Sequence, residues 1–152
     1  MTDTLPLIVG ELNPYSEDDH FALYPRPRNA SGYRLATKIM GLTEMEYIRS
    51  FDRVNLCHIK WNVHQARGRA SALRFHGPYN RFILLGAKVS KAFGFEFEPF
   101  TAKMEGAKRF VLLPHPSGLN RAWNQCDAVD HARIALIEAG MLKNNGYLPD
   151  PA

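Results

Sequence analysis

Hydrophobic and polar positions along this chain form blocks that predict strands and helices in alternation. Short apolar runs bounded by glycine, proline or polar residues are typical of buried strands. Four such runs cover residues 5–9, 53–58, 81–86 and 109–113. Parallel strands need a crossover between them, usually a helix, so this alternation predicts a parallel sheet with helices on both faces.

Capping residues and apolar spacing predict the helices. Thr43 and Glu46 form a capping-box pattern for a short helix through residue 49, and Ser31 is expected to cap a helix that ends at Gly41. The apolar spacing before Gly140 predicts the longest helix. The predicted segments are helices over 32–40, 65–75 (broken by Gly68), 87–93 (ended by Gly94) and 122–139, and irregular or edge structure over 95–104.

These elements predict a three-layer α/β/α fold with a central, mostly parallel four-stranded sheet. With 152 residues and 45% hydrophobic content, the chain is long enough for one core, so we expect a single domain over 1–152. In such sheets ligands bind beyond the carboxyl ends of the strands. We therefore expect the functional site among the loops that begin at Gly10, near His58, at Gly86 and at Pro114.

Composition narrows the possible partners and cofactors. The formal net charge of +4 and the pI near 9.2 favour polyanions such as nucleic acid slightly, although an ordinary surface could carry the same charge. Cys57 and Cys126 are far apart, which excludes a zinc site or iron–sulfur cluster built from thiolates and predicts two reduced thiols. Without a targeting signal or a membrane span in the sequence, we expect a cytoplasmic protein.

The segment 113–121, Leu-Pro-His-Pro-Ser-Gly-Leu-Asn-Arg, is the strongest candidate for function. Pro114 and Pro116 fix φ on both sides of His115 and favour extended backbone before each proline. The imidazole is therefore expected to be held in one direction on a stiff loop that follows a buried strand.

Two asparagines lie at or near the same predicted edge of the sheet. Asn13 precedes Pro14 and is either a turn residue or an amide that orients water opposite His115. Asn55 lies within an apolar strand, where an unpaired amide would be costly. It either caps a neighbouring loop or reads the edge of a pyrimidine, because an amide both donates and accepts.

Aromatic and basic residues add weaker candidates. Tyr24, and less strongly Phe21, could stack on a base from the long loop after Asn13, or simply pin that loop. Two arginine groups could contact phosphates or form solvated faces. They are Arg26, Arg28 and Arg34, and Arg67, Arg69 and Arg74.

Two motifs, in this order within a βα framework, resemble those of the uracil-DNA glycosylase superfamily. Residues 12–15, Leu-Asn-Pro-Tyr, are similar to its first motif, Asp/Asn-Pro-Tyr/Gly. Residues 113–121 are similar to its second motif, with the Gly-Leu-x-Arg ending of the mismatch-specific branch and the histidine of the classical and single-strand-selective branches. The resemblance spans most of the chain and implies a monomeric DNA glycosylase without a metal or organic cofactor.

The resemblance assigns roles at the reacting centre. His115 would stabilise, as a neutral imidazole, the negative charge on O2 of the departing pyrimidine, and Asn13 would hold the water that attacks the sugar. Bond cleavage builds an oxocarbenium-like sugar and an anionic base, so a fixed donor helps most in the transition state. Asn55 matches the base-reading amide, and Tyr24 is the best match for the aromatic residue that stacks on the flipped base.

The resemblance also assigns contacts to DNA. Leu119 corresponds to the wedge that enters the duplex when the target nucleotide leaves the stack, a step that costs a few kcal/mol. The residues expected to grip DNA nearby are Ser117, Gly118 and Arg121. Tyr15 would block a C5 methyl group and so favour uracil over thymine.

The implied activity is excision of uracil, or a related altered base, from DNA by a monofunctional glycosylase that leaves an abasic site. The chain departs from the family because Glu11 stands where many relatives have glycine and Asn13 replaces the stronger aspartate. Two alternatives stay open: a glycosylase for a bulkier modified base, and a nucleic-acid-binding relative without catalysis.

Overall fold

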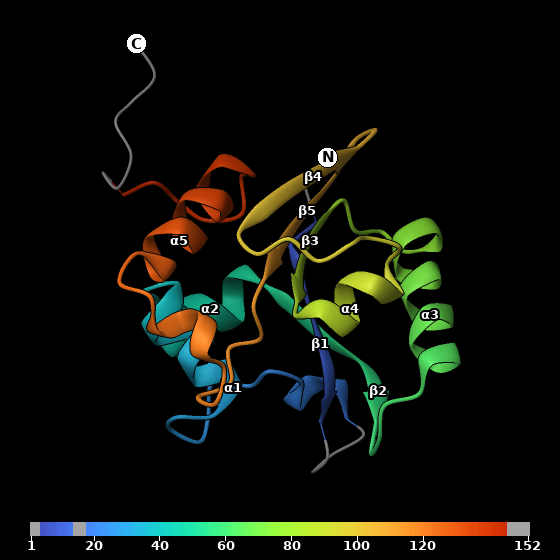
Figure 1. The fold of residues 1–152 in the computed structure, drawn as a ribbon, viewed down its shortest axis with the longest axis horizontal. Helices are drawn as coiled ribbons and strands as arrows, with labels where there is room; N and C mark the ends of the chain where they lie inside the picture. Colours follow the sequence, from blue (N-terminus) through green and yellow to red (C-terminus); the bar gives the residue numbers. More distant parts are fainter. Residues whose placement is uncertain (1–3, 14–17, 146–152) are drawn as a thin grey trace.

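The structure, a computed structural model, describes residues 4–13 and 18–145 and contains a five-stranded sheet between two layers of helices (Figure 1). The strands are β1 (Leu7–Asn13), β2 (Asp52–His58), β3 (Arg81–Leu85), β4 (Thr101–Glu105) and β5 (Lys108–Leu113). They lie in the order β2-β1-β3-β5-β4, and all neighbours are parallel except β4 and β5. The predicted α/β fold with a mostly parallel sheet is therefore confirmed.

The expected number of four strands is wrong, because residues 101–105 add a fifth. β4 pairs with β5 in antiparallel register from Thr101↔Leu112 to Glu105↔Lys108. Its residues are exposed or only partly buried, so the segment lacks the apolar run that identifies the other strands. Pairing with one neighbour in a hairpin, rather than burial, accounts for this strand.

β1 is also longer than expected, because pairing with β2 continues beyond Gly10. Gly10 lies opposite Asn55, and Asn13, the last residue of the strand, lies opposite His58. The extension brings Glu11 into the strand. The strand therefore ends at Asn13, four residues beyond the predicted end at Val9.

Helices cover both faces of the sheet, each over its own hydrophobic core (Figure 1). One face carries η2 (Arg34–Ile39), α2 (Glu44–Ser50) and α5 (Ala128–Glu138). The other carries α3 (Val63–Ser71) and α4 (Ala87–Ala92). The buried apolar side chains of β1, β3 and β5 alternate between these cores, each contributing roughly 1.5–3 kcal/mol when it is large.

Several predicted helix boundaries are confirmed. Thr43 Oγ1 accepts a hydrogen bond from the Glu46 main-chain N–H, and the Glu46 carboxylate accepts one from the Thr43 N–H, both at 3.1 Å. The glycines expected to end helices adopt positive φ. They are Gly41, Gly94 and Gly140.

Ser31 is not the helix cap that the sequence predicts. It is the first residue of α1 (Ser31–Tyr33), which continues directly into the π-helical turn η2, and Ala30 precedes it without a side-chain cap. Gly32 accounts for the packing here, because an ideal Cβ on it would lie 2.1 Å from the Tyr24 carbonyl oxygen. The long loop therefore packs directly on this helix.

Gly68 does not break a helix. α3 runs through it and continues as η3 (Ala72–His76), and a side chain at Gly68 would meet no atom within 4 Å. The position is at the helix surface, where glycine lowers stability by about 1 kcal/mol relative to alanine but does not stop the helix.

The single long helix predicted over 122–139 is wrong. The segment forms a short 3-10 helix, η4 (Arg121–Asn124), and α5 begins only at Ala128, after an extended Gln125 and a turn over 126–127. Asn120 caps η4 by accepting a hydrogen bond from the Ala122 N–H at 3.0 Å. Contacts to the preceding loop, described below, outweigh the helical apolar spacing.

Candidate active site

The carboxyl ends of β1, β3 and β5 bring Glu11, Gly86 and His115 together. An ideal Cβ on Gly86 would lie 3.6 Å from Glu11 Oε1 and 3.6 Å from His115 Cβ, so this glycine lies between the carboxylate and the imidazole. Gly86 has a φ of +92°, a backbone conformation that favours glycine, and its N–H donates to the Leu113 carbonyl at 2.7 Å. The three parallel strands thus set the spacing of a carboxylate and an imidazole.

The hydrogen bond that His115 accepts determines which nitrogen of the neutral ring carries the proton. The main-chain N–H of Ser117 donates to Nδ1 of His115 at 3.2 Å. Nδ1 must therefore hold a lone pair, and the proton of the neutral imidazole lies on Nε2. His115 is consequently a neutral side chain with one N–H donor left to offer a ligand.

Burial keeps this imidazole neutral. Burial lowers the pKa of His115 below its ordinary value of 6.5, and the Glu11 carboxylate raises it by a smaller amount. The lowered pKa of His115 fits an imidazole that acts as a neutral N–H donor at neutral pH.

Two side chains that the sequence analysis did not assign hold the peptide of His115. The carbonyl oxygen of His115 accepts hydrogen bonds from Asn120 Nδ2 at 3.1 Å and from Trp123 Nε1 at 3.0 Å. Trp123 also packs edge-on against Phe100, with 5.5 Å between the ring centroids. The signal in the sequence was an amide and an indole just after the His-Pro-Ser-Gly run, both able to donate to a loop carbonyl.

Glu11 is the other residue whose place in the site was missed. In the sequence, Glu11 is only a departure from the family pattern, because the strand was expected to end at Val9 and the loop to begin at Gly10. A carboxylate directly after a buried strand, at the edge where ligands bind, was the available signal.

Asn55 lies on β2 with its side chain against the backbone of β1. The residue is 4% exposed, and an ideal Cβ on Gly10 would lie 2.5 Å from its Oδ1. No hydrogen bond joins the Asn55 side chain to any other residue in the described ranges. An amide that can both donate and accept, at the edge of the sheet where ligands bind, fits a group that contacts a ligand.

The other residues expected to contact substrate have different outcomes. Asn13 ends β1 at the same edge of the sheet as His115, and its side chain lies outside the described part of the structure, as does all of Tyr15. Tyr24 is partly buried, and its ring lies 5.7 Å from the rings of both His20 and Phe21.

The loop after His115 presents the residues expected to contact DNA. Leu119 is 93% exposed, far more than an apolar side chain with a packing role would be. Ser117 Oγ accepts a hydrogen bond from the Leu119 N–H at 3.2 Å, which shapes the turn. The Arg34 guanidinium lies beside Gly118, with its Cζ 3.6 Å from an ideal Cβ there, and Arg121 is exposed. An exposed apolar tip with cations nearby fits contact with nucleic acid.

The remaining arginine candidates mostly have protein partners. Arg26 pairs with Glu44 on α2 at 2.7 Å, and Arg69 pairs with Asp19. Arg74 is buried, where it donates to the Phe93 carbonyl and pairs with Glu105. Arg74 is therefore a structural residue and not a phosphate contact.

A large cavity lies away from these groups. It has a volume of about 760 Å³ and is lined by the residues before β1, the start of β3 and the segment after α5. Two of the arginines that line it, Arg81 and Arg133, are partly buried and donate to main-chain carbonyls, those of Gly140 and Ile39 among them. Since it lies at the amino ends of the strands, we place the candidate site at the opposite edge, where the titratable groups converge.

No protein-family model matches the sequence, and no curated protein shows significant similarity to it.

Within the described residues, no helix is both long and apolar enough to span a membrane. Across the same ranges, no three His, Cys, Asp or Glu side chains gather as they would around a metal ion. Cys57 is buried and Cys126 exposed, both as free thiols.

Proposed function

We propose that this protein is a DNA N-glycosylase that hydrolyses the bond between deoxyribose and uracil, or a related altered base. The observation that carries the proposal is the neutral His115 imidazole, whose Nδ1 accepts from the Ser117 N–H and whose Nε2–H is left to donate. A base that leaves with the electrons of its glycosidic bond becomes an anion. A fixed N–H donor stabilises that anion through a hydrogen bond, and the imidazole that carries it is already in its neutral form.

The second half of the reaction needs a water molecule and a proton acceptor. The water oxygen bonds to C1′ of the sugar, and one of its protons must leave. Glu11, across Gly86 from His115, is the carboxylate placed to accept that proton and to stabilise the cationic sugar, with Asn13 positioning the water. The departing base takes up a proton after release, so atoms and charges balance without a redox step.

Recognition of the base is assigned to Asn55 and Tyr24. Asn55, a residue 4% exposed, offers an amide donor and acceptor to the edge of a pyrimidine. Tyr24 offers an aromatic face for stacking. Leu119 would fill the space in the duplex after the nucleotide is extruded.

Single-turnover excision from labelled oligonucleotides, followed by alkaline cleavage at abasic sites, tests this function. The panel carries uracil, hypoxanthine, thymine mismatches and hydroxymethylated bases, so it also detects a preference for a bulkier base. His115→Ala should lower the rate about 10²–10³-fold, the usual cost of one transition-state donor. His64→Ala, at an exposed position on α3, is the matched control.

Two outcomes would contradict the proposal. One is binding of these oligonucleotides by the wild-type protein without release of any base, which would favour a relative that binds nucleic acid without catalysis. The other is wild-type excision by the His115→Ala and Asn13→Ala variants, which would remove the assigned roles.

A further inference from the structure

A short helical turn beside the candidate site displays aromatic rings at the surface. In η1 (Asp19–Phe21), His20 is exposed and Phe21 is 47% exposed, and their ring centroids lie 5.1 Å apart at an interplanar angle of 80°. Both rings also lie 5.7 Å from the ring of Tyr24. The exposed rings are therefore continuous with the residue assigned to stack on the target base.

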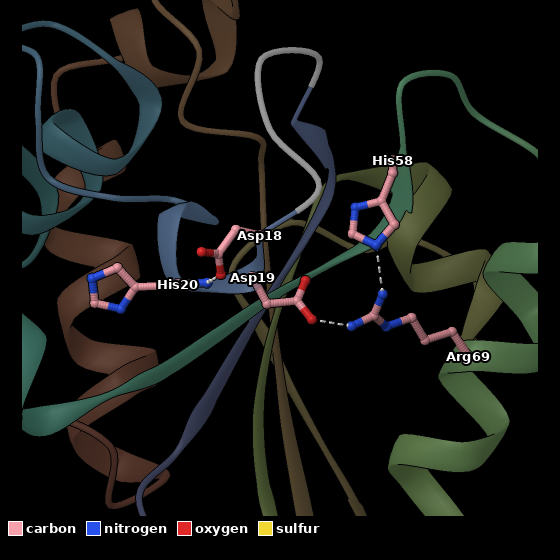
Figure 2. A network of polar contacts seen from close by, with 5 residues as sticks. All are labelled: Asp18, Asp19, His20, His58 and Arg69. Atoms are coloured by element: carbon pink, nitrogen blue, oxygen red, sulfur yellow. Dashed lines mark hydrogen bonds and ion pairs between the residues drawn. The ribbon is translucent and has the colours of Figure 1, made fainter.

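Burial does not hold η1 in place, since none of its residues is buried. Figure 2 shows one polar anchor: the Asp19 carboxylate accepts from Arg69 Nη2 at 2.5 Å, and Arg69 Nη1 lies 3.1 Å from His58 Nε2. Asp18 adds a cap by accepting from the His20 N–H at 2.9 Å. The anchor connects η1 to α3 and to the end of β2.

A second anchor comes from β2 beneath the turn. Arg53 Nη1 donates to the carbonyl oxygens of His20 and Ala22 at 3.2 and 3.1 Å. Its guanidinium also lies 5.5 Å from the ring centroid of Tyr24. Next to it, the Tyr47 hydroxyl donates to the Leu23 carbonyl at 2.9 Å.

Among the described residues, three buried polar atoms of these anchors have no hydrogen-bond partner. They are Asp19 Oδ1, Arg53 Nε and His58 Nδ1. A segment with only a structural role would gain more by burying its aromatic rings than by holding them in solvent with incompletely satisfied polar groups. The arrangement therefore favours a surface kept rigid for a ligand.

We propose that His20 and Phe21 form a stacking platform for an unpaired nucleobase next to the target nucleotide, with Arg53 and Arg69 as positioning residues. Aromatic and imidazole rings stack on any base, and the guanidinium of Arg34, at the start of η2 and beside Gly118, supplies positive charge for the nucleic-acid backbone. The location of the target base rests on the proposed function. The stacking itself does not require that function.

Fluorescence of 2-aminopurine tests the platform. The probe is a single-stranded oligonucleotide with 2-aminopurine beside 2′-fluoro-deoxyuridine, whose fluorine blocks cleavage by destabilising the cationic sugar. Binding to the wild-type protein should quench the fluorescence. Phe21→Ala, and more strongly His20→Ala with Phe21→Ala, should remove the quenching and weaken binding about tenfold or more.

Phe75→Ala is the matched control, because Phe75 is 63% exposed and lies on η3, away from η1. It should bind and quench as the wild type does. Wild-type quenching by the His20→Ala/Phe21→Ala variant would overturn the platform. So would an equal loss of binding to a fully paired duplex of the same sequence, because the assigned ligand is an unpaired base.

Variants of the anchors test positioning. Arg69→Met and Arg53→Met should lose quenching as Phe21→Ala does, and Arg69→Lys should restore much of it while all remain folded by circular dichroism. Wild-type quenching by both methionine variants would overturn the positioning role. Quenching is measured without cleavage, so the two proposals are tested separately. A wild-type protein that excises no base would contradict the proposed function, and the quenching data would still decide whether the platform exists.

Discussion

At His115, two opposite influences act on one imidazole. Burial favours the neutral ring, and Glu11 favours the cation, with burial the stronger. The Ser117 N–H then selects the tautomer by donating to Nδ1. Burial and Glu11 thus act on the charge of the ring, and the Ser117 N–H selects its tautomer.

The pH dependence of excision follows from this balance. If His115 acts while neutral, the rate should hold as pH falls through 6.5 and decline only near its lowered pKa. Glu11→Gln removes the influence that raises the pKa, so the His115 titration followed by NMR should move to lower pH, with the five other histidines as internal references. An unchanged or higher midpoint would contradict the proximity of the two groups.

The same shift affects folding in a defined direction. The unfolded chain binds the His115 proton more tightly than the folded chain, because the folded pKa is the lower one. This contribution to stability is therefore complete above about pH 6.5 and is lost as pH falls toward the lowered pKa.

Gly10 determines where Asn55 can lie. Gly10→Ala would place a Cβ 2.5 Å from Asn55 Oδ1 and 3.1 Å from Leu23 Cδ1, so the amide must move. We expect a loss of about 1–3 kcal/mol in the free energy of unfolding, measured with urea. Adding Asn55→Ala should recover part of it, and purely additive effects of the two changes would contradict the contact.

Among the elements, η4 links the fold to the His115 loop. It replaces the first turns of the predicted long helix and places the indole of Trp123 so that it donates to the His115 carbonyl. Helical apolar spacing in this segment reflected burial of α5 and carried no information about that hydrogen bond. Tertiary hydrogen bonding therefore determined the helix boundary.

Trp123→Phe tests this link. The ring should still pack on Phe100, but the N–H is lost, so we expect about 1 kcal/mol lower stability and an excision rate lower by about tenfold or more, because the imidazole is less well placed. The control is Trp61→Phe, which changes the other tryptophan, packed on the opposite core. Equal effects of both variants on the rate would contradict the link.

The sequence predicted elements that depend on local signals and missed those that depend on pairing. The parallel strands and the Thr43–Glu46 capping box follow from apolar runs and short-range hydrogen bonds. β4 depends on its partner, and the extension of β1 to Asn13 depends on β2. Glu11 was missed for the same reason, because its place in the site follows from that extension.

At the scale of the whole molecule, the two edges of the sheet differ. The carboxyl edge carries the titratable pair, the exposed Leu119 and the exposed Arg121. At the amino edge, Arg81 and Arg133 are engaged with main-chain carbonyls around the cavity. The formal charge of +4 is thus less informative than its distribution.

Salt dependence of DNA binding tests which edge contacts the nucleic acid. Each phosphate contact contributes about 0.7–0.9 to the slope of log affinity against log salt. Arg121→Gln should reduce the slope by about that amount, whereas Lys143→Gln, exposed at the amino edge, should leave it unchanged. The reverse result would place DNA on the other edge.

The glycine between Glu11 and His115 has a consequence for how this protein could be altered. The spacing of these two groups depends on main-chain hydrogen bonds between neighbouring strands, whereas Tyr24 and η1 lie in the segment between β1 and α1. Base preference could therefore be redesigned in the loops while the reacting groups keep their separation. Substitutions in the segment that contacts the base would then change its preference without changing the spacing of Glu11 and His115.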